Sequence, residues 1–421
     1  MTTSETVNVQ QADPAGTYDG DATSRNSVAG QLHPAAFTVL VAGLSMLGQF
    51  AIATYLPAFA DMARSLGASA AQIQQSITAY MLPFGLMVLW HGAISDAVGR
   101  RRMILVGLAL FSAGSLLCAT ARELNVLYAG RVIQGCSAGI GVIVGRAMVR
   151  DCFQGAAAQR QMALVAMVFS LSPAIAPVCG GWLLYWAGWR SIFVFLSALT
   201  ALMMLAAWRW LPETLPADKR HSLRPVALAR AYVEVFALPK FVCLALANAG
   251  VNMAIYVYIF AAPEFVTRHL GLNAQSFAWL FGPIVVGLLV GSLLGHRAAG
   301  AMSPWRSVAF GHIVMFAANL LNVAISWLHG PGIPWSLLAL PIFSVGLMLT
   351  QPGLQLLALD CVPARRGLAS SCYVAAQQFG NAISAAVLIP PLMGSTLGLA
   401  AGMAGLQLFG AAMLLLAHRL R

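Results

Sequence analysis

The sequence predicts an all-α membrane protein with twelve transmembrane helices, and two observations support this prediction. Hydrophobic residues make up 59% of the chain and charged residues only 9%, whereas ordinary soluble domains carry roughly 25% charged residues. The chain also divides into apolar segments of about 20 residues, the length that crosses a hydrocarbon core about 30 Å thick. Backbone groups cannot stay unpaired in lipid, so these segments should be helices. The expected spans are 34–58, 73–93, 103–121, 125–149, 161–185, 190–210, 241–263, 274–295, 306–328, 334–359, 367–391 and 396–418.

Residues 1–33 precede the first span and are rich in Ser, Thr, Asp, Gly, Gln and Asn. They contain no apolar run and no signal-peptide pattern, so we expect a disordered cytoplasmic tail. The first span is too long for the apolar region of a signal peptide and has no small-residue cleavage site after it, so it should stay in the chain. Prolines interrupt spans 161–185 and 334–359, which membrane helices tolerate where neighbours satisfy the freed carbonyl groups.

The net charge of +11 is explained by membrane orientation rather than by nucleic-acid binding. If the N-terminus is cytoplasmic and the spans alternate, 19 of the 24 Lys and Arg residues lie on the inner side. Arg131 alone falls deep within a span, and four arginines lie outside. An excess of Lys and Arg marks the cytoplasmic side, so both termini should be inside. The outer four are Arg64, Arg122, Arg190 and Arg268.

The longest inner connection divides the chain into two matched parts. Residues 211–240 hold four prolines and mixed charge, and they separate six spans in 34–210 from six spans in 241–421. Matched six-helix halves are typical of proteins that bind a solute near the membrane midplane between halves that move against each other. We expect a monomer in a lipid bilayer.

Polar side chains form stripes on three spans. Residues four apart share a face of a helix, and such faces are costly in lipid unless they hydrogen-bond to another helix or line a wet cavity. Both explanations are open for any one pair, but three stripes in one half favour a shared cavity for an uncharged or zwitterionic organic solute. The stripes are Asn248, Asn252 and Tyr256; Gln351 and Gln355; and Tyr373, Gln377 and Asn381.

Arg131 is the charge placed deepest within a span, and Gln134 follows within one turn. An unpaired guanidinium there is expensive, so it should face water, carbonyl groups or substrate. Structural anchoring and substrate binding both fit, and we include Arg131 and Gln134 among the candidate substrate-binding residues.

The sequence contains no pattern typical of a disulfide framework, a metal site or an enzyme. Seven scattered cysteines without paired spacing argue against a disulfide framework or a zinc site. The chain has no G-x-x-x-x-G-K-[ST] or H-E-x-x-H motif, so neither an ATP-driven pump nor a metalloprotease is expected. We therefore predict no enzyme, no cofactor and no metal.

Several motifs carry a family resemblance over about residues 34–418. The loop at 92–102, with Asp96, Gly99, Arg100 and Arg101, resembles the signature between the second and third helices of major facilitator transporters, Gly-x-Leu-x-Asp-Arg-x-Gly-Arg-Arg. Residues 127–135 resemble the fourth-helix motif, and 177–181, with Pro177, Gly180 and Gly181, the fifth-helix antiporter motif. A narrower resemblance, to the bicyclomycin/chloramphenicol-resistance (Bcr/CflA-type) drug:proton antiporters, rests on Tyr55-Leu56-Pro57, Arg150-Asp151, Trp189-Arg190, 211–216 and 367–371.

This resemblance implies roles for two of the motifs. Asp96 and the arginines would form a charge cluster with the inner ends of neighbouring helices and lock one access state. Pro177, Gly180 and Gly181 would bend and thin the fifth helix at the seam between the halves.

Ile94, Ala97 and Ala176 depart from the family motifs, and one further departure bears on proton coupling. The acid expected just before Tyr55-Leu56-Pro57 is replaced by Ala53, and none of the 13 Asp and Glu residues falls at a span midplane. A buried carboxylate is the ordinary proton carrier, so Glu264, at the outer end of the seventh span, becomes the candidate for proton coupling.

The leading interpretation is a secondary exporter of small organic molecules across a bacterial inner membrane, with protons as the coupling ion. Export of a siderophore or another endogenous metabolite, or a facilitator without proton coupling, is the alternative.

Overall fold

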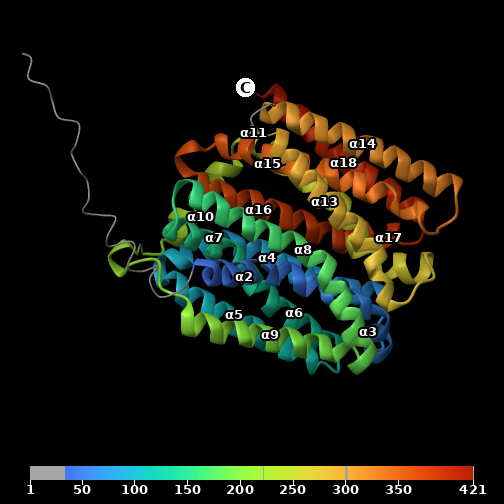
Figure 1. Cartoon of the computed structure of the whole chain (residues 1–421), viewed down its shortest axis with the longest axis horizontal. Coiled ribbons are helices and arrows are strands. Elements are labelled where there is room, and N and C mark those ends of the chain that lie inside the picture. Colours follow the sequence, from blue (N-terminus) through green and yellow to red (C-terminus); the bar gives the residue numbers. More distant parts are fainter. Residues whose placement is uncertain (1–33, 221, 299–301, 421) are drawn as a thin grey trace, which may run out of the picture.

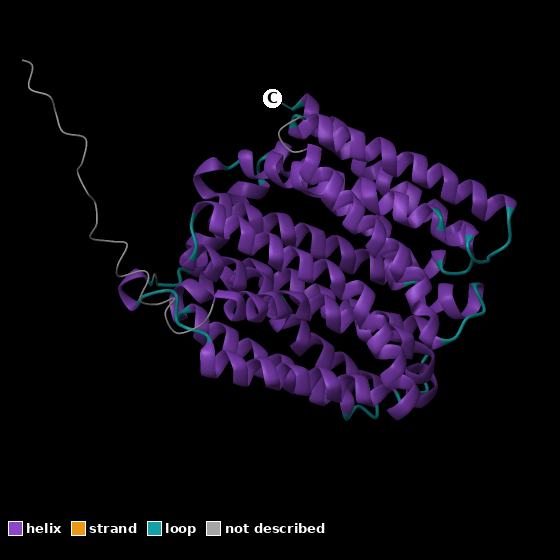
Figure 2. Cartoon of the chain, in the orientation of Figure 1, coloured by secondary structure: helices purple, strands orange, loops and turns teal. Residues whose placement is uncertain are grey.

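The computed structural model describes residues 34–220, 222–298 and 302–420, and helices make up nearly all of it (Figure 2). Within these residues, twelve helical segments are long and apolar enough to cross a membrane, which confirms the predicted fold class. The tail at 1–33, predicted to be disordered, lies outside the described residues. The membrane-length segments are Ala36–Leu66, Ala70–Val98, Arg100–Ala119, Leu124–Cys152, Ala157–Ala187, Trp189–Trp210, Pro239–Phe260, Ala274–Arg297, Pro304–Leu328, Trp335–Asp360, Pro363–Leu392 and Thr396–Arg419.

Two sets of helices build the molecule (Figure 1). The first contains α2 (Pro34–Tyr55), η1 (Leu56–Ala58), α3 (Phe59–Leu66), α4 (Ala70–Val98), α5 (Arg100–Ala119), α6 (Leu124–Ala138), α7 (Ile140–Cys152), α8 (Gly155–Ala187) and α9 (Trp189–Trp210). After the linker helix α10 (Pro225–Phe236), the second contains α11 (Pro239–Phe260), α12 (Ala262–Glu264), η3 (Phe265–His269), η4 (Ala274–Phe277), α13 (Ala278–Ala298), α14 (Pro304–Leu328), α15 (Ala339–Asp360), α16 (Arg366–Ile383), η7 (Ser384–Leu388), α17 (Ile389–Leu392) and α18 (Thr396–Arg419).

The helices extend beyond the apolar segments of the sequence. Residues 73–93 predict the second span, but α4 begins after Ser69, whose Oγ accepts from the Gln72 amide while the Gln72 side chain accepts from the Ser69 amide. This capping box satisfies two N–H groups that a helix start leaves unpaired. At its other end α4 continues to Gly99, whose φ of +100° reverses the chain. A capping box at one end and a glycine turn at the other, rather than hydropathy, therefore determine the ends of this helix.

The two helix sets pack in matching ways. In the first set α2 packs on α8, α4 on α6, and α5 on α6 and α9. The corresponding contacts of the second set are α11 on α16, α13 on α15, and α14 on α15 and α18. Between the sets, α4 packs on α16 and α8 packs on α13. Because α4 corresponds to α13 and α16 corresponds to α8, the two helix pairs at the seam are related by the pseudo-symmetry that relates the halves.

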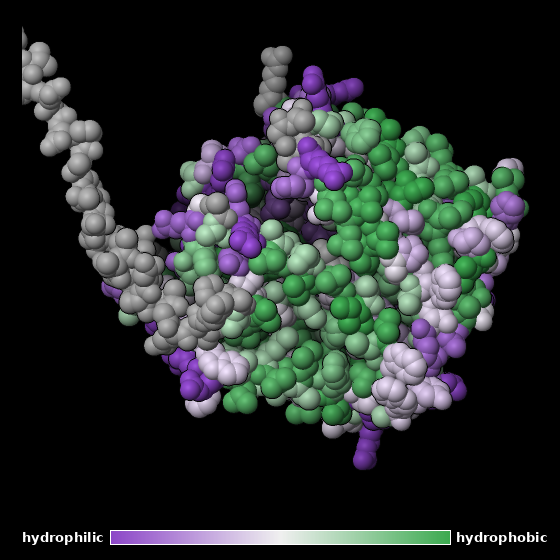
Figure 3. Space-filling view, viewed as in Figure 1, coloured by the Kyte–Doolittle hydropathy of each residue, from purple (hydrophilic) through white to green (hydrophobic). Residues whose placement is uncertain are grey.

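The outer surface suits a bilayer. Apolar residues cover much of the face in Figure 3, and large aromatic side chains near helix ends are exposed, among them Trp186, Trp208 and Trp327 at 71, 61 and 75%. Tryptophan is enriched where the hydrocarbon meets the headgroups. These residues agree with a multi-pass membrane protein.

We call the end of the bundle that carries Pro34, Arg419 and the linker the terminal face, and the other end the far face. The halves meet near the far face: Gln75 Nε2, near the start of α4, donates to Ala386 O in η7 at 3.2 Å. Near the terminal face the linker helix α10 contacts both halves, because the Tyr232 hydroxyl donates to Leu89 O and Glu234 pairs with Arg365 at 2.8 Å. Figure 3 shows a recess between the halves, with hydrophilic residues around it.

Candidate functional site

A cavity of about 390 Å³ lies between the two halves. Helices α2, α4, α7 and α8 form one wall, and α11, α13, α15 and α16 form the other. Much of the lining is apolar, including Phe84, Phe169, Ile255, Leu347 and Met348. Six of the ten candidate substrate-binding residues line this cavity: Asn252, Tyr256, Gln351, Gln355, Tyr373 and Gln377.

The amides of α11 and α16 form one hydrogen-bonded group. Gln377 Nε2 donates to Asn252 Oδ1 at 3.0 Å, and Asn252 Nδ2 donates to Asn248 Oδ1 at 2.9 Å. Asn248 Nδ2 in turn donates to Gln377 Oε1 at 3.2 Å. Asn248 does not line the cavity, so within this group it holds the two lining amides in place.

Two hydroxyl groups give the cavity further polar contacts. The Tyr256 hydroxyl donates to Gln49 Oε1 on α2 at 3.1 Å and thereby joins the two halves. Tyr373 is 3% exposed, and its buried hydroxyl has no hydrogen-bond partner among the described residues. A buried polar group without a partner costs free energy, so a bound solute that bonded to this hydroxyl would be stabilised.

Asn381 lies one layer behind the cavity. Its Nδ2 donates to Gln378 Oε1 at 3.4 Å, and Gln378 lines the cavity while Asn381 does not. Its part in substrate binding stays a prediction.

Arg131 and Gln134 form a separate buried site in the first half. The guanidinium carbon of Arg131 lies 4.4 Å from the Tyr55 ring centroid and 4.2 Å from that of Tyr80. Arg131 Nη1 donates to Gln134 Oε1 at 2.7 Å, and Gln134 Nε2 donates to Ser115 Oγ at 2.7 Å. Two aromatic faces and an amide stabilise the charge. Neither Arg131 nor Gln134 lines the cavity, so their binding of substrate also stays a prediction.

Four polar residues of the cavity are absent from the predicted site residues. The largest omission is Arg146, which the charge count assigns to the inner side but which lies within the span Leu124–Cys152 and lines the cavity. Its position inside the expected span 125–149 was the signal that could have identified it. The others are Ser45, Gln49 and Gln378.

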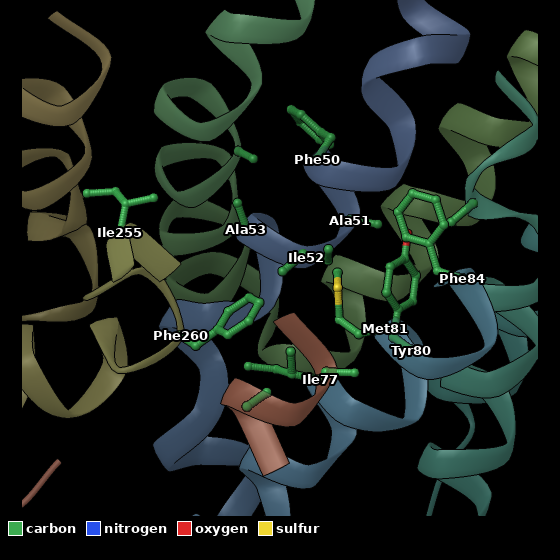
Figure 4. Packing of buried hydrophobic residues seen from close by; sticks show 14 of the residues in the cluster. Phe50, Ala51, Ile52, Ala53, Ile77, Tyr80, Met81, Phe84, Ile255 and Phe260 are labelled. Carbon is green, nitrogen blue, oxygen red and sulfur yellow. The ribbon is translucent and has the colours of Figure 1, made fainter. Parts of the chain in front are cut away.

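The position of the missing acid is buried. Ala53 is 4% exposed, and Figure 4 shows it in a neighbourhood that includes the apolar side chains of Ile52, Ile255 and Phe260. Among the described residues, no carboxylate lines the cavity. Glu264 lies outside it, and its Oε1 is 2.8 Å from Arg268 Nη1. Coupling through Glu264 stays a prediction.

A charge cluster surrounds the turn between α4 and α5. Asp96 Oδ1 lies 2.5 Å from Arg100 Nη1, and Arg100 Nε lies 3.3 Å from Asp151 Oδ2 at the end of α7. Arg101 reaches the Trp208 carbonyl at the end of α9. The expected cluster of helix ends is therefore present, with these partners all in the first half; its action as a lock stays a prediction.

Glu213 extends this cluster from the linker. Its Oε1 accepts from the Arg100 amide at 2.9 Å, and its Oε2 accepts from the Arg101 amide at 3.3 Å. These are the first two residues of α5, whose N–H groups have no partner inside the helix. A carboxylate at a helix N-terminus also suits the helix dipole. A side chain at Gly99 would displace the Glu213 carboxylate, and the φ of +100° at this position already favours glycine.

Pro177, Gly180 and Gly181 lie within the continuous helix α8. A Cβ added at Gly180 would overlap the Thr54 carbonyl oxygen on α2, in the same half. One added at Gly181 would lie 2.6 Å from the Ala274 carbonyl oxygen, in the second half. Of the two glycines, Gly181 is therefore the one that permits close approach across the seam.

The chain is similar in sequence to known proteins. The sequence model of the Major Facilitator Superfamily matches residues 38–385. Multidrug resistance protein D of Escherichia coli (strain K12) is 30% identical over 372 residues, which cover 86% of this chain and 91% of that protein. The bicyclomycin resistance protein homolog of Haemophilus influenzae is 25% identical over 261 residues, or 62% of this chain and 66% of that one.

A solved structure shares the fold. The crystal structure of a D-xylose-proton symporter superposes with a TM-score of 0.72 at 15% sequence identity, covering 91% of this chain and 96% of the other. At this identity the likeness concerns the fold alone.

Proposed function

The chain belongs to the Major Facilitator Superfamily, and from this premise we propose that it exports small organic molecules across a bacterial inner membrane by alternating access. The observation that carries the proposal is the cavity between the halves, in which amide and hydroxyl groups are placed against apolar walls. Such mixed walls suit drug-sized organic solutes. Its relatives named for multidrug and bicyclomycin resistance support the same substrate class.

Charge and packing indicate the side to which the cavity opens in this state. The excess of Lys and Arg supports a cytoplasmic terminal face. The contacts of Gln75 with Ala386 and of Gly181 with Ala274 join the halves near the far face, which supports a state closed toward the outside. In this state a solute would enter the cavity from the cytoplasm.

Protons are the proposed coupling ion, with Glu264 as the candidate carrier. A group that couples protons must change its proton affinity between access states. Glu264 is paired with Arg268 in this state, and loss of that pair in the other state would provide the change. A facilitator without coupling is the second candidate, and it is favoured by Ala53 at the position of the expected acid and by the absence of a carboxylate among the described lining residues.

We propose two devices for the conformational cycle. The cluster of Asp96, Arg100 and Glu213 would stabilise one access state, and Gly181 would allow the far-face seam to close. Both devices are made by residues outside the cavity lining. Substitutions in them should therefore lower the transport rate more than they lower the affinity for substrate.

The test is expression of the chain in a bacterial strain lacking its own efflux pumps. Bicyclomycin, chloramphenicol and the carboxylate drug nalidixic acid would be used for growth inhibition and for uptake into everted membrane vesicles. We expect resistance and energy-dependent uptake that Gln377→Ala weakens and that Gln159→Ala, at an exposed position of α8, leaves unchanged. No resistance to and no uptake of any of the three compounds would contradict the proposal.

A further inference from the structure

Arg146 presents an unpaired positive charge to the cavity. It is partly buried, and it has no hydrogen bond or ion pair with any described residue. The acid nearest to it in sequence, Asp151, already accepts from Arg100 Nε at 3.3 Å and from Thr214 Oγ1 at 3.0 Å. Arg146 therefore lacks the compensation that a guanidinium within a membrane span ordinarily has.

Two comparisons within the chain show that this charge needs a partner. The buried Arg131 is stabilised by two tyrosine rings and Gln134. Arg146, by contrast, is followed one turn later by the exposed Arg150, and like charges at i and i+4 repel each other. An anion in the cavity would be attracted by both cations and would neutralise the inner one.

Residues from both halves lie at the depth of Arg146. It stands six residues before the end of α7, Gln355 five before the end of α15, and Tyr373 seven after the start of α16. At 1.5 Å per residue these positions are about 7–11 Å from the terminal ends of their helices. Arg146 thus shares a level with an amide and with the Tyr373 hydroxyl, which has no partner among the described residues.

We propose that the cavity binds amphipathic organic anions, with their carboxylate or other acidic group on Arg146. A guanidinium can bond both oxygens of a carboxylate, and the Tyr373 hydroxyl and Gln355 amide can donate to the same group. The apolar body would extend toward Phe84, Phe169 and Ile255. Cationic solutes are disfavoured, because no described lining residue carries a negative charge. This assignment rests on the proposed transport function and specifies its substrate class. The neutral amides alone had suggested uncharged or zwitterionic solutes, and Arg146 changes that expectation to anions.

The experiment compares two probes that share one fluorophore. Dansylglycine carries a carboxylate and dansylglycinamide does not, and both are titrated against the purified full chain in lipid nanodiscs by fluorescence. We expect the parent to prefer dansylglycine by roughly tenfold or more, the effect of a charge-assisted bidentate contact. Arg146→Gln should abolish the preference, Arg146→Lys should retain part of it, and the matched control Arg150→Gln should retain most of it. A parent without the preference, or a folded Arg146→Gln chain that keeps it, overturns the proposal.

A second measurement uses the unaltered chain, so it does not depend on the folding of the variants. Phenylglyoxal modifies accessible arginines, and peptide mass mapping locates the modified residues. Dansylglycine should slow modification of Arg146 while dansylglycinamide does not; equal modification in both cases overturns the proposal. Failure here leaves the export proposal intact if bicyclomycin or chloramphenicol is still transported, whereas a chain that binds dansylglycine without transporting any compound refutes export alone.

Discussion

Replacing Gly181 by alanine should push the protein out of the state in which its far face is closed. The new Cβ would lie 2.6 Å from the Ala274 carbonyl oxygen and 3.3 Å from the Gln275 Cα, and real Cβ contacts essentially never fall below 3.0 Å. Helix α8 and η4 must therefore separate by at least 0.4 Å, the difference between 3.0 and 2.6 Å. Overpacking of this kind typically costs about 1–3 kcal/mol.

The cost falls on one state because the contact crosses the seam between the halves. When the far face opens, Gly181 and Ala274 move apart and the overlap disappears. A differential cost of about 1–3 kcal/mol shifts a two-state equilibrium by about 5- to 150-fold. Gly181→Ala should therefore raise the ratio of molecules open to molecules closed at the far face by a factor in this range.

Spin labels placed across the far face measure this population. Arg64 and Arg268 have side chains 79 and 65% exposed, and they belong to opposite halves, so both can be replaced by labelled cysteines in a cysteine-depleted chain. Electron–electron double resonance should then show a longer distance component that grows in Gly181→Ala.

Two glycine variants provide matched controls. Gly282→Ala, in α13, places a Cβ where no atom lies within 4 Å, so the distance distribution should not change. Gly180→Ala overlaps Thr54 within one half, so it should lower thermal stability without selecting a state. If Gly181→Ala leaves the distances unchanged, or if Gly282→Ala changes them equally, the contact between Gly181 and Ala274 does not control opening of the far face.

Four further outcomes are expected. Gln377→Ala removes an amide bonded to both Asn248 and Asn252 and should weaken binding of a confirmed substrate by about 1–3 kcal/mol, measured by calorimetry; an unchanged affinity would argue against this wall as the binding surface. Asp96→Asn breaks the pair with Arg100 and should lower the transport rate while sparing affinity, so a large loss of affinity with intact cycling would contradict the switch role. Glu264→Gln should abolish substrate-driven proton movement in proteoliposomes if Glu264 is the carrier, and antiport that survives the change would exclude it. Membrane-impermeant thiol reagents applied from outside should label a cysteine at position 64 and miss one at 220, and the reverse pattern would invert the topology.

Part of the cavity was predictable because helical spacing is a local property. Asn252 and Tyr256 share a face of α11 whatever surrounds that helix, and the cost of polar groups in lipid indicates that such a face is covered by protein or water. The spacing could not separate Asn252, which lines the cavity, from Asn248, which supports it from behind. That distinction depends on how α16 is rotated against α11.

Arg146 shows the opposite case. Arg146 is close in sequence to Arg150 and to the end of a span, so it was counted with the charges of the inner face. The positive-inside rule predicts on which side of the membrane a charge lies, but not how deep in the membrane it lies. Its place in the cavity depends on α7 facing α15 and α16 across the seam. The partner of Gln49 was hidden for the same reason, since Tyr256 follows it by 207 residues.

Composition, span length and charge asymmetry were enough to predict a twelve-helix membrane protein, because hydropathy acts on each segment independently of its neighbours. The motif at 92–102 likewise located the charge cluster, because Asp96 and Arg100 lie on adjoining turns. The Glu213 cap of α5, the pairing of Gly180 with α2 but of Gly181 with the second half, and the meeting of Arg146 with Tyr373 in one cavity could be seen only after folding. Each of these joins residues far apart in the chain, and such contacts depend on the relative rotation and depth of whole helices, which no local pattern encodes.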